Sequence, residues 1–148
     1  MIRNEKRLRL CTALLICNLI FIWGNSLLPG EISGAFSDWI KEILEALLPG
    51  DGENVPGGGL LRKLAHFTEF ACLGALLAWH SLLREEKHIF AFPALLGMAA
   101  GLVDETIQLF TPDRGPSLTD VWIDTSGALT GIMLLILGHH LIKRKQNH

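Results

Sequence analysis

The sequence predicts an all-α fold, a four-helix transmembrane bundle with one further amphipathic helix outside the membrane between the first two spans. Hydrophobic residues make up 49% of the 148-residue chain, mean hydropathy is +0.35, and the apolar residues form long blocks. Four blocks reach the roughly 20 residues that a bilayer core about 30 Å thick requires. We therefore expect a single membrane domain over 1–148, with a motif-bearing core at 62–131.

The four predicted spans are 10–28, 60–83, 89–110 and 118–142. The first follows the basic segment "MIRNEKRLRL", which resembles the start of a signal peptide. However, the apolar block after it is about as long as a full span, and no clear small-x-small cleavage site precedes "NSLLPGE". We expect this block to be retained as the first span.

Lysine and arginine predict the orientation, because short loops that are rich in them stay cytoplasmic. Nine lie on one side of the predicted spans: Arg3, Lys6, Arg7, Arg9, Arg84, Lys87, Lys143, Arg144 and Lys145. Four lie on the other: Lys41, Arg62, Lys63 and Arg114. Both termini are therefore predicted to be cytoplasmic. The formal net charge of −2 gives no reason to expect nucleic acid as a partner.

The predicted external loop between the first two spans contains an amphipathic segment, "AFSDWIKEILEALLPGD". At helical spacing its apolar residues share one face: Phe36, Trp39, Ile40, Ile43, Leu44 and Leu47. The segment is too short to span, so it would either lie in the outer membrane interface or cover the external ends of the bundle as a lid. The glycine- and proline-rich stretch 49–59 after it is predicted to be a linker.

Polar residues interrupt three of the predicted spans at the same depth, near the external side. Arg62, His66 and Glu69 form one stripe over about 10 Å of helix rise. Two further stripes combine polar residues with glycines: Gly97, Gly101, Asp104 and Gln108, then Asp120, Asp124, Gly127 and Gly131. Because small residues allow helix backbones to approach closely, these stripes should face the inside of the bundle.

The predicted cluster carries more acidic than basic groups. Its acids are Glu69, Asp104, Glu105, Asp113, Asp120 and Asp124, and its cations are Arg62, Lys63 and Arg114, to which His66 can add one charge. Even with every cation recruited, an excess of negative charge remains. Either some carboxylates are protonated or a cation is bound, and a divalent metal is one candidate.

The turn "TPDRGPSLTD" before the last span fixes its backbone with two prolines, and Ser117 or Thr119 can cap the following helix. We expect it to hold Arg114 over the external mouth of the cluster. There the guanidinium could bind a carboxylate of the cluster or a phosphate on a ligand.

The segments "RKLAHFTEFACLG" and "DETIQLFTPDRGPSLTDVWIDTSGALTG" resemble the VanZ-like family of small bacterial membrane proteins. The motif positions of that family fall here on Lys63, His66, Glu69, Asp104, Glu105, Gln108, Arg114, Asp120, Asp124 and Gly127. The resemblance implies a multi-spanning bacterial cell-membrane protein, in a family named for a member linked to resistance to the glycopeptide teicoplanin. Asp124 stands where many members have asparagine, so the resemblance implies a hydrogen-bonding role at this position rather than a required charge.

Together these features predict a binding site formed by Arg62, Lys63, His66, Glu69, Asp104, Glu105, Gln108, Arg114, Asp120 and Asp124. Besides the bilayer itself, the expected partner is a lipid-linked envelope precursor or a phospholipid headgroup, met at the outer leaflet. A basic rim suits phosphate or carboxylate.

Two other functions stay open. In a membrane-embedded enzyme acting on a lipid headgroup, His66 would be the general base, Glu69 or Asp120 would orient it, and Arg114 would stabilise anionic charge. A metal-dependent version would use His66, Glu69, Asp104 and Asp124 as ligands of a hard divalent ion. Alternatively, the charged residues only fix helix packing, and the function lies in partner contacts.

Overall fold

The computed structural model describes residues 2–47, 57–115 and 117–146, and over these residues the chain is all-α, as predicted. The helices are α1 (Ile2–Ser26), α2 (Gly30–Leu47), α3 (Gly58–Leu83), α4 (Ala91–Leu109) and α5 (Leu118–Gln146). Most of the predicted linker 49–59 lies outside the described residues.

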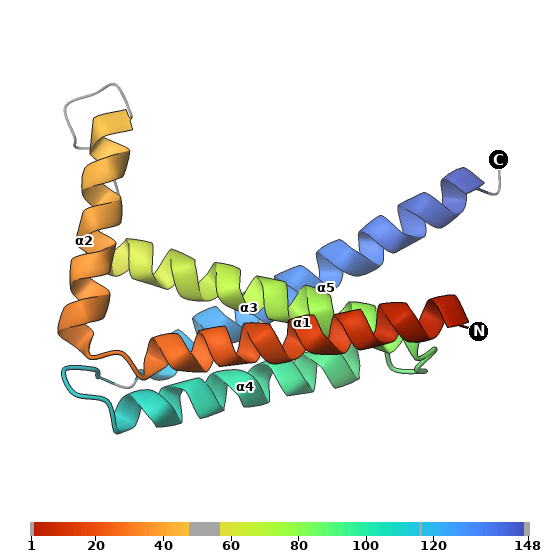
Figure 1. The fold of residues 1–148 in the computed structure, drawn as a ribbon, viewed down its shortest axis with the longest axis horizontal. Helices are drawn as coiled ribbons and strands as arrows, with labels where there is room; N and C mark the ends of the chain where they lie inside the picture. The colour runs from red at the N-terminus through yellow and green to blue at the C-terminus, as the bar shows by residue number, and fades with distance from the viewer. Residues whose placement is uncertain (1, 48–56, 116, 147–148) are drawn as a thin grey trace.

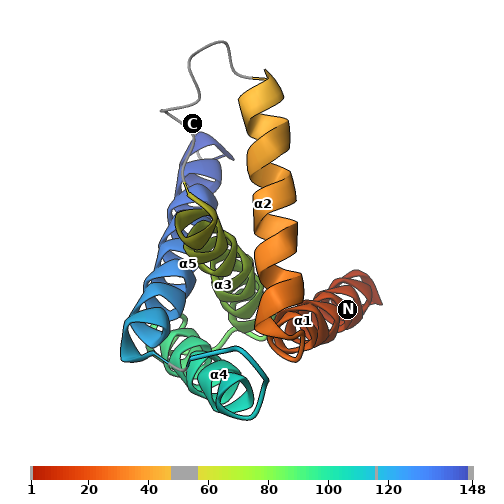
Figure 2. The ribbon, with the colours of Figure 1, turned by 90° about the vertical axis from the view of Figure 1, so that its left-hand side faces the viewer.

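Helices α1, α3, α4 and α5 run along one another, and α2 crosses one end of this bundle (Figure 1). Seen from that end, α3 occupies the centre, and it contacts each of the other four helices (Figure 2). Both ends of the chain lie at the opposite end of the bundle from α2 (Figure 1). The four lengthwise helices therefore alternate in direction along the chain, as in a bundle whose successive helices are antiparallel.

Two helices begin well before the residues predicted for them. The basic amino-terminal segment is part of α1, and α2 begins at Gly30, five residues before the amphipathic segment that predicted it. The early start of α2 follows from its docking on the α4–α5 loop. The Gly30 N–H donates to the Pro112 carbonyl at 3.0 Å, and a side chain at Gly30 would collide with the backbone of Asp113.

Helices α3 and α5 make the closest packing of the bundle, and glycines allow it. A Cβ at Gly127 would meet the carbonyl of Phe67, and one at Gly131 would meet the carbonyl of Ala71. From the other side, Gly74 packs on the carbonyl of Ala128. The prediction that the glycine stripe of the last helix faces the inside is confirmed, and of the two acids on that stripe Asp124 is buried and Asp120 half-buried.

A small apolar core lies one helical turn from a buried polar layer. Ile22 in α1, Phe70 in α3 and Ala100 in α4 belong to the core. Four positions away from them, on the side nearer α2, lie Ser26, His66 and Asp104. Because i and i+4 side chains of a helix share a face, the residues that position the core also position the polar layer.

The outside of the bundle is apolar. Large hydrophobic side chains are exposed on all four lengthwise helices, among them Ile20, Leu64, Leu102 and Leu137. Ser26, Asp104, Gln108 and Asp124, by contrast, are all 0% exposed. Within the described residues, two helices are long and apolar enough to cross a membrane, over Asn4–Ser26 and Leu118–Gln146. Helices α3 and α4 carry polar residues of the buried layer, including His66, Glu69, Asp104 and Gln108.

Candidate polar site between α1, α3, α4 and α5

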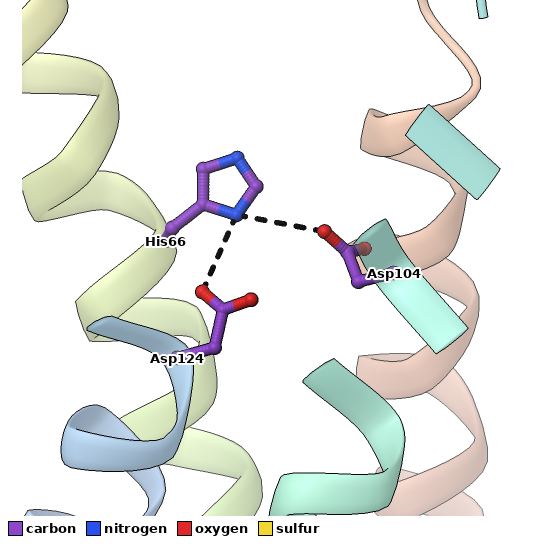
Figure 3. A group of neighbouring side chains, drawn as sticks. All are labelled: His66, Asp104 and Asp124. Atoms are coloured by element: carbon purple, nitrogen blue, oxygen red, sulfur yellow. Dashed lines mark ion pairs between the residues drawn. The ribbon is translucent and has the colours of Figure 1, made fainter. Parts of the chain in front are cut away.

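Three ionisable side chains from three helices converge inside the bundle, as predicted (Figure 3). His66 Nδ1 of α3 lies 3.8 Å from Asp104 Oδ2 of α4 and 3.7 Å from Asp124 Oδ1 of α5. Both distances exceed the 2.7–3.2 Å typical of an N–H···O hydrogen bond. We call His66, Asp104 and Asp124 the central triad.

Asp104 is held from both sides. Ser26 Oγ donates to its Oδ1 at 2.6 Å, and Gln108 Nε2 donates to its Oδ2 at 2.8 Å. Gln108 is in turn oriented by Arg62, whose Nη2 donates to the amide oxygen at 3.3 Å. These contacts hold the Asp104 carboxylate in place. They also link two of the predicted site residues to it, Gln108 directly and Arg62 through Gln108.

Asp124 is buried without any such support. Neither of its carboxylate oxygens has a hydrogen-bond partner, and His66 Nδ1 likewise has none. Among the described residues, no lysine or arginine nitrogen lies within 4.0 Å of Asp104 or Asp124. The two fully buried carboxylates therefore face a single histidine.

The other two acids of the buried layer have separate partners. Glu69 accepts a hydrogen bond from Asn25 Nδ2 at 3.0 Å. Glu105 accepts one from the backbone N–H of Ser117 at 2.8 Å, while the Ser117 hydroxyl accepts one from the N–H of Thr119 at 3.2 Å. Glu105 therefore holds the start of α5, where Ser117 is one of the two predicted caps.

Arg114 binds backbone carbonyls rather than a carboxylate of the cluster. Its Nε donates to the Leu28 carbonyl at 3.2 Å and its Nη2 to the Asn25 carbonyl at 3.0 Å. No carboxylate oxygen of the described residues lies within 4.0 Å of its guanidinium, so the predicted pairing with an acid is wrong. Physically, carbonyls at and just after the end of a helix lack i+4 partners within it. The Asn25 carbonyl accepts from the Leu28 N–H at 3.2 Å as well as from Arg114, and Arg114 also donates to the Leu28 carbonyl.

The Arg114 guanidinium nevertheless keeps a free donor. Its Nη1 is buried without a hydrogen-bond partner. Burial, with the nearby Arg62 as a second cause, lowers the pKa of Arg114 from its ordinary value. Arginine remains charged in proteins all the same, so Arg114 is a buried cation with one unused nitrogen.

Lys63 and Asp120 lie at the edge of the site. Together with Arg62, His66 and Ile123 they line a hollow of about 10 Å³ between α3 and α5. Lys63 is exposed, and Asp120 is half-buried.

A larger cavity of about 340 Å³ lies between α1, α2 and α3. Its apolar wall includes Phe21 of α1 and Ile32, Phe36 and Ile40 of α2. Its polar end is formed by Asn25, Arg62, His66, Glu69 and Arg114. Helix α2 thus closes one side of the cavity, while Trp39 on the same helix is 55% exposed.

Two residues of the site were not predicted from the sequence. Asn25 and Ser26 are absent from the predicted set, yet they donate to Glu69 and Asp104. Their position along the first span could have indicated this role. They lie at the end of α1, which is on the same side of the predicted bundle as the other polar residues. Their helix face could not be inferred, since α1 has no glycine stripe to orient it.

The four lengthwise helices expose apolar side chains and enclose a polar site. This arrangement is that of a membrane protein with a buried polar site. The sequence matches the VanZ/LLP1 family over residues 10–139, so this chain belongs to that family and is a membrane protein. The match includes every residue of the central triad and of the cavity's polar end. No curated protein and no solved structure matches the chain.

Proposed function

We propose that this protein spans the membrane with α1, α3, α4 and α5, and binds the headgroup of a lipid-linked envelope component from the outer leaflet. Exposed hydrophobic side chains on all four helices support the spans. The excess of lysine and arginine at the end that carries both termini supports a cytoplasmic location for that end. Helix α2 then lies at the outer surface.

The observation that carries this proposal is the cavity between α1, α2 and α3. Its volume of about 340 Å³ is at the lower end of the range for ligand pockets. An amphiphile fits its two-part lining, with an acyl or prenyl chain against Phe36 and Ile40 and an anionic headgroup at Arg62 and Arg114. The unused Nη1 of Arg114 is a donor suited to phosphate.

Recognition of such a component would account for a link to glycopeptide resistance. These antibiotics act on envelope components displayed at the outer leaflet. A protein that holds or covers a lipid-linked component there would change what the antibiotic meets. The family membership is consistent with this role.

Binding can be tested by native mass spectrometry of the detergent-solubilised protein, titrated with a polyprenyl phosphate in the presence of EDTA. Ser33→Trp fills the cavity from α2, whereas Ala35→Trp places the same side chain at an exposed position two residues away. We expect Ser33→Trp to lose binding and Ala35→Trp to retain it, at equal thermal stability. Equal binding by both variants would contradict the proposal.

The resistance link has its own test. The two tryptophan variants are expressed at equal levels in a teicoplanin-susceptible host, and the inhibitory concentration is compared with that of the unmodified protein. We expect protection with Ala35→Trp and none with Ser33→Trp. Protection by both would separate resistance from the cavity.

An enzyme acting on a lipid headgroup is the second candidate, and the position of His66 favours it. His66 lines the cavity and faces two carboxylates. The residues that would orient it are then Asp104 and Asp124, in place of Glu69, which is bonded to Asn25, and Asp120, which lies at the edge. Turnover of an added lipid-linked phosphate, lost in His66→Ala, would support catalysis over binding alone.

A further inference from the structure

We propose that the central triad binds one divalent cation, with His66 Nδ1 and one carboxylate oxygen each from Asp104 and Asp124 as ligands. These three ligand atoms lie within 4.8 Å of one another. The ion would be a cofactor of the protein, and its binding does not depend on the proposed lipid ligand.

The two separations from His66 fit ligands of a shared ion better than direct contacts. Two ligands bound at about 2.1 Å to one ion lie roughly 3.0 to 4.2 Å apart, depending on the angle between them. His66 Nδ1 is 3.8 Å from Asp104 Oδ2 and 3.7 Å from Asp124 Oδ1, within this range. A direct ion pair with hydrogen bonding would bring the same atoms to about 2.7–2.9 Å.

The charge and the missing hydrogen bonds of the triad also favour a bound cation. Asp124 is 0% exposed, and both of its oxygens lack partners. A protonated Asp124 would need an acceptor for its own O–H, and an ionised one would need a cation, since a buried charge without compensation is costly. One divalent ion would neutralise both carboxylates and occupy the unpartnered Nδ1 of His66, in the tautomer that carries its proton on Nε2.

The surroundings of Asp104 match those of a metal ligand. Its two oxygens accept hydrogen bonds from Ser26 and Gln108, and such outer contacts orient carboxylate ligands in metal sites. One imidazole nitrogen and two carboxylate oxygens suit Mn²⁺ or Zn²⁺. Three protein ligands leave coordination positions open, as in catalytic rather than structural sites.

Distance sets the limits of the site. Glu69 accepts a hydrogen bond from Asn25 and Glu105 one from the Ser117 backbone, and each keeps one buried oxygen without a partner. Among the described residues, however, the ligand atoms that lie within 4.8 Å of one another belong to His66, Asp104 and Asp124. The four-ligand set predicted from the sequence is therefore reduced to three, without Glu69.

The test is metal binding by the purified, lipid-free full chain in detergent. The protein is stripped with EDTA, incubated with Mn²⁺ or Zn²⁺ alone, and analysed for bound metal by electron paramagnetic resonance of Mn²⁺ and by elemental analysis for Zn²⁺. We expect about one ion per chain. We also expect Asp124→Ala and His66→Ala to weaken binding at least tenfold. Asp124→Asn, which keeps the shape of the side chain, provides the same comparison if the alanine variants fail to fold.

Matched controls separate the triad from other histidines and acids. His139→Ala/His140→Ala removes the neighbouring pair near the end of α5, and Asp113→Asn removes an exposed acid. Both variants should bind as the unmodified protein does. Absence of stoichiometric binding, or binding lost with the His139/His140 pair and kept in Asp124→Ala and Asp124→Asn, would overturn the assignment. Neither result would bear on the proposed lipid binding, which is measured separately in the presence of EDTA.

Discussion

The hydroxyl of Ser26 donates a 2.6 Å hydrogen bond to the carboxylate of Asp104 although 78 residues separate them in the chain. This buried contact joins the end of α1 to α4, and it lies one turn from the apolar core formed by Ile22 and Ala100. It shows that the first helix is part of the polar site.

Ser26→Ala should destabilise the protein by about 1 to 3 kcal/mol, because Asp104 Oδ1 would be buried without its donor. Unfolding in mixed micelles, followed by circular dichroism, measures the loss. The matched control is Ser126→Ala on α5, whose exposed hydroxyl donates only to the Trp122 carbonyl of its own helix. Equal stability of the two variants would contradict a structural role for the Ser26–Asp104 contact.

Gly131→Ala should also destabilise the protein, because the added methyl group would collide with the Ala71 carbonyl and force α3 and α5 apart. We expect a loss of about 1 to 3 kcal/mol, as for other overpacked sites. Gly138→Ala lies on the same helix with nothing within 4 Å, so it should be neutral or stabilising. Thermal unfolding compares the two, and tolerance of Gly131→Ala would mean that the helices pack less closely than the structure shows.

Arg114→Lys should destabilise the protein nearly as much as Arg114→Ala. A lysine cannot reproduce the two separate donors that Arg114 directs at the Leu28 and Asn25 carbonyls. Arg84→Lys, at an exposed position, is the control. If Arg114→Lys unfolds at the same temperature as the unmodified protein, positive charge alone is sufficient at this position.

The proposed topology predicts opposite labelling of two loops. In a variant with Cys11, Cys17 and Cys72 replaced by serine, Asp113→Cys should react with a membrane-impermeant maleimide added to intact cells. Lys87→Cys should react only after lysis. Both positions are exposed, so accessibility within the protein does not distinguish them. Labelling of Lys87→Cys from outside would reverse the orientation.

Much of the bundle could be predicted because its signals are local. Apolar blocks located the lengthwise helices, and glycines at four-residue spacing indicated the faces of α4 and α5, which carry Asp104 and Asp124. Arg114 was harder, because a long side chain on a turn can reach many acceptors and sequence cannot rank carbonyls against carboxylates. The contribution of Ser26 was hidden for a related reason, since nothing in α1 marks which face meets α4.

The central claim is that His66, Asp104 and Asp124 converge from three helices, and cysteine bridging tests it most directly. In the background lacking Cys11, Cys17 and Cys72, we expect His66→Cys/Asp124→Cys and His66→Cys/Asp104→Cys to be bridged by Hg²⁺ in membranes. The bridged pairs would then resist modification by maleimide. Leu64→Cys/Trp122→Cys, at exposed positions on the same helices, is the control and should stay reactive. Full reactivity of both triad pairs after Hg²⁺ treatment would contradict the convergence on which the candidate site rests.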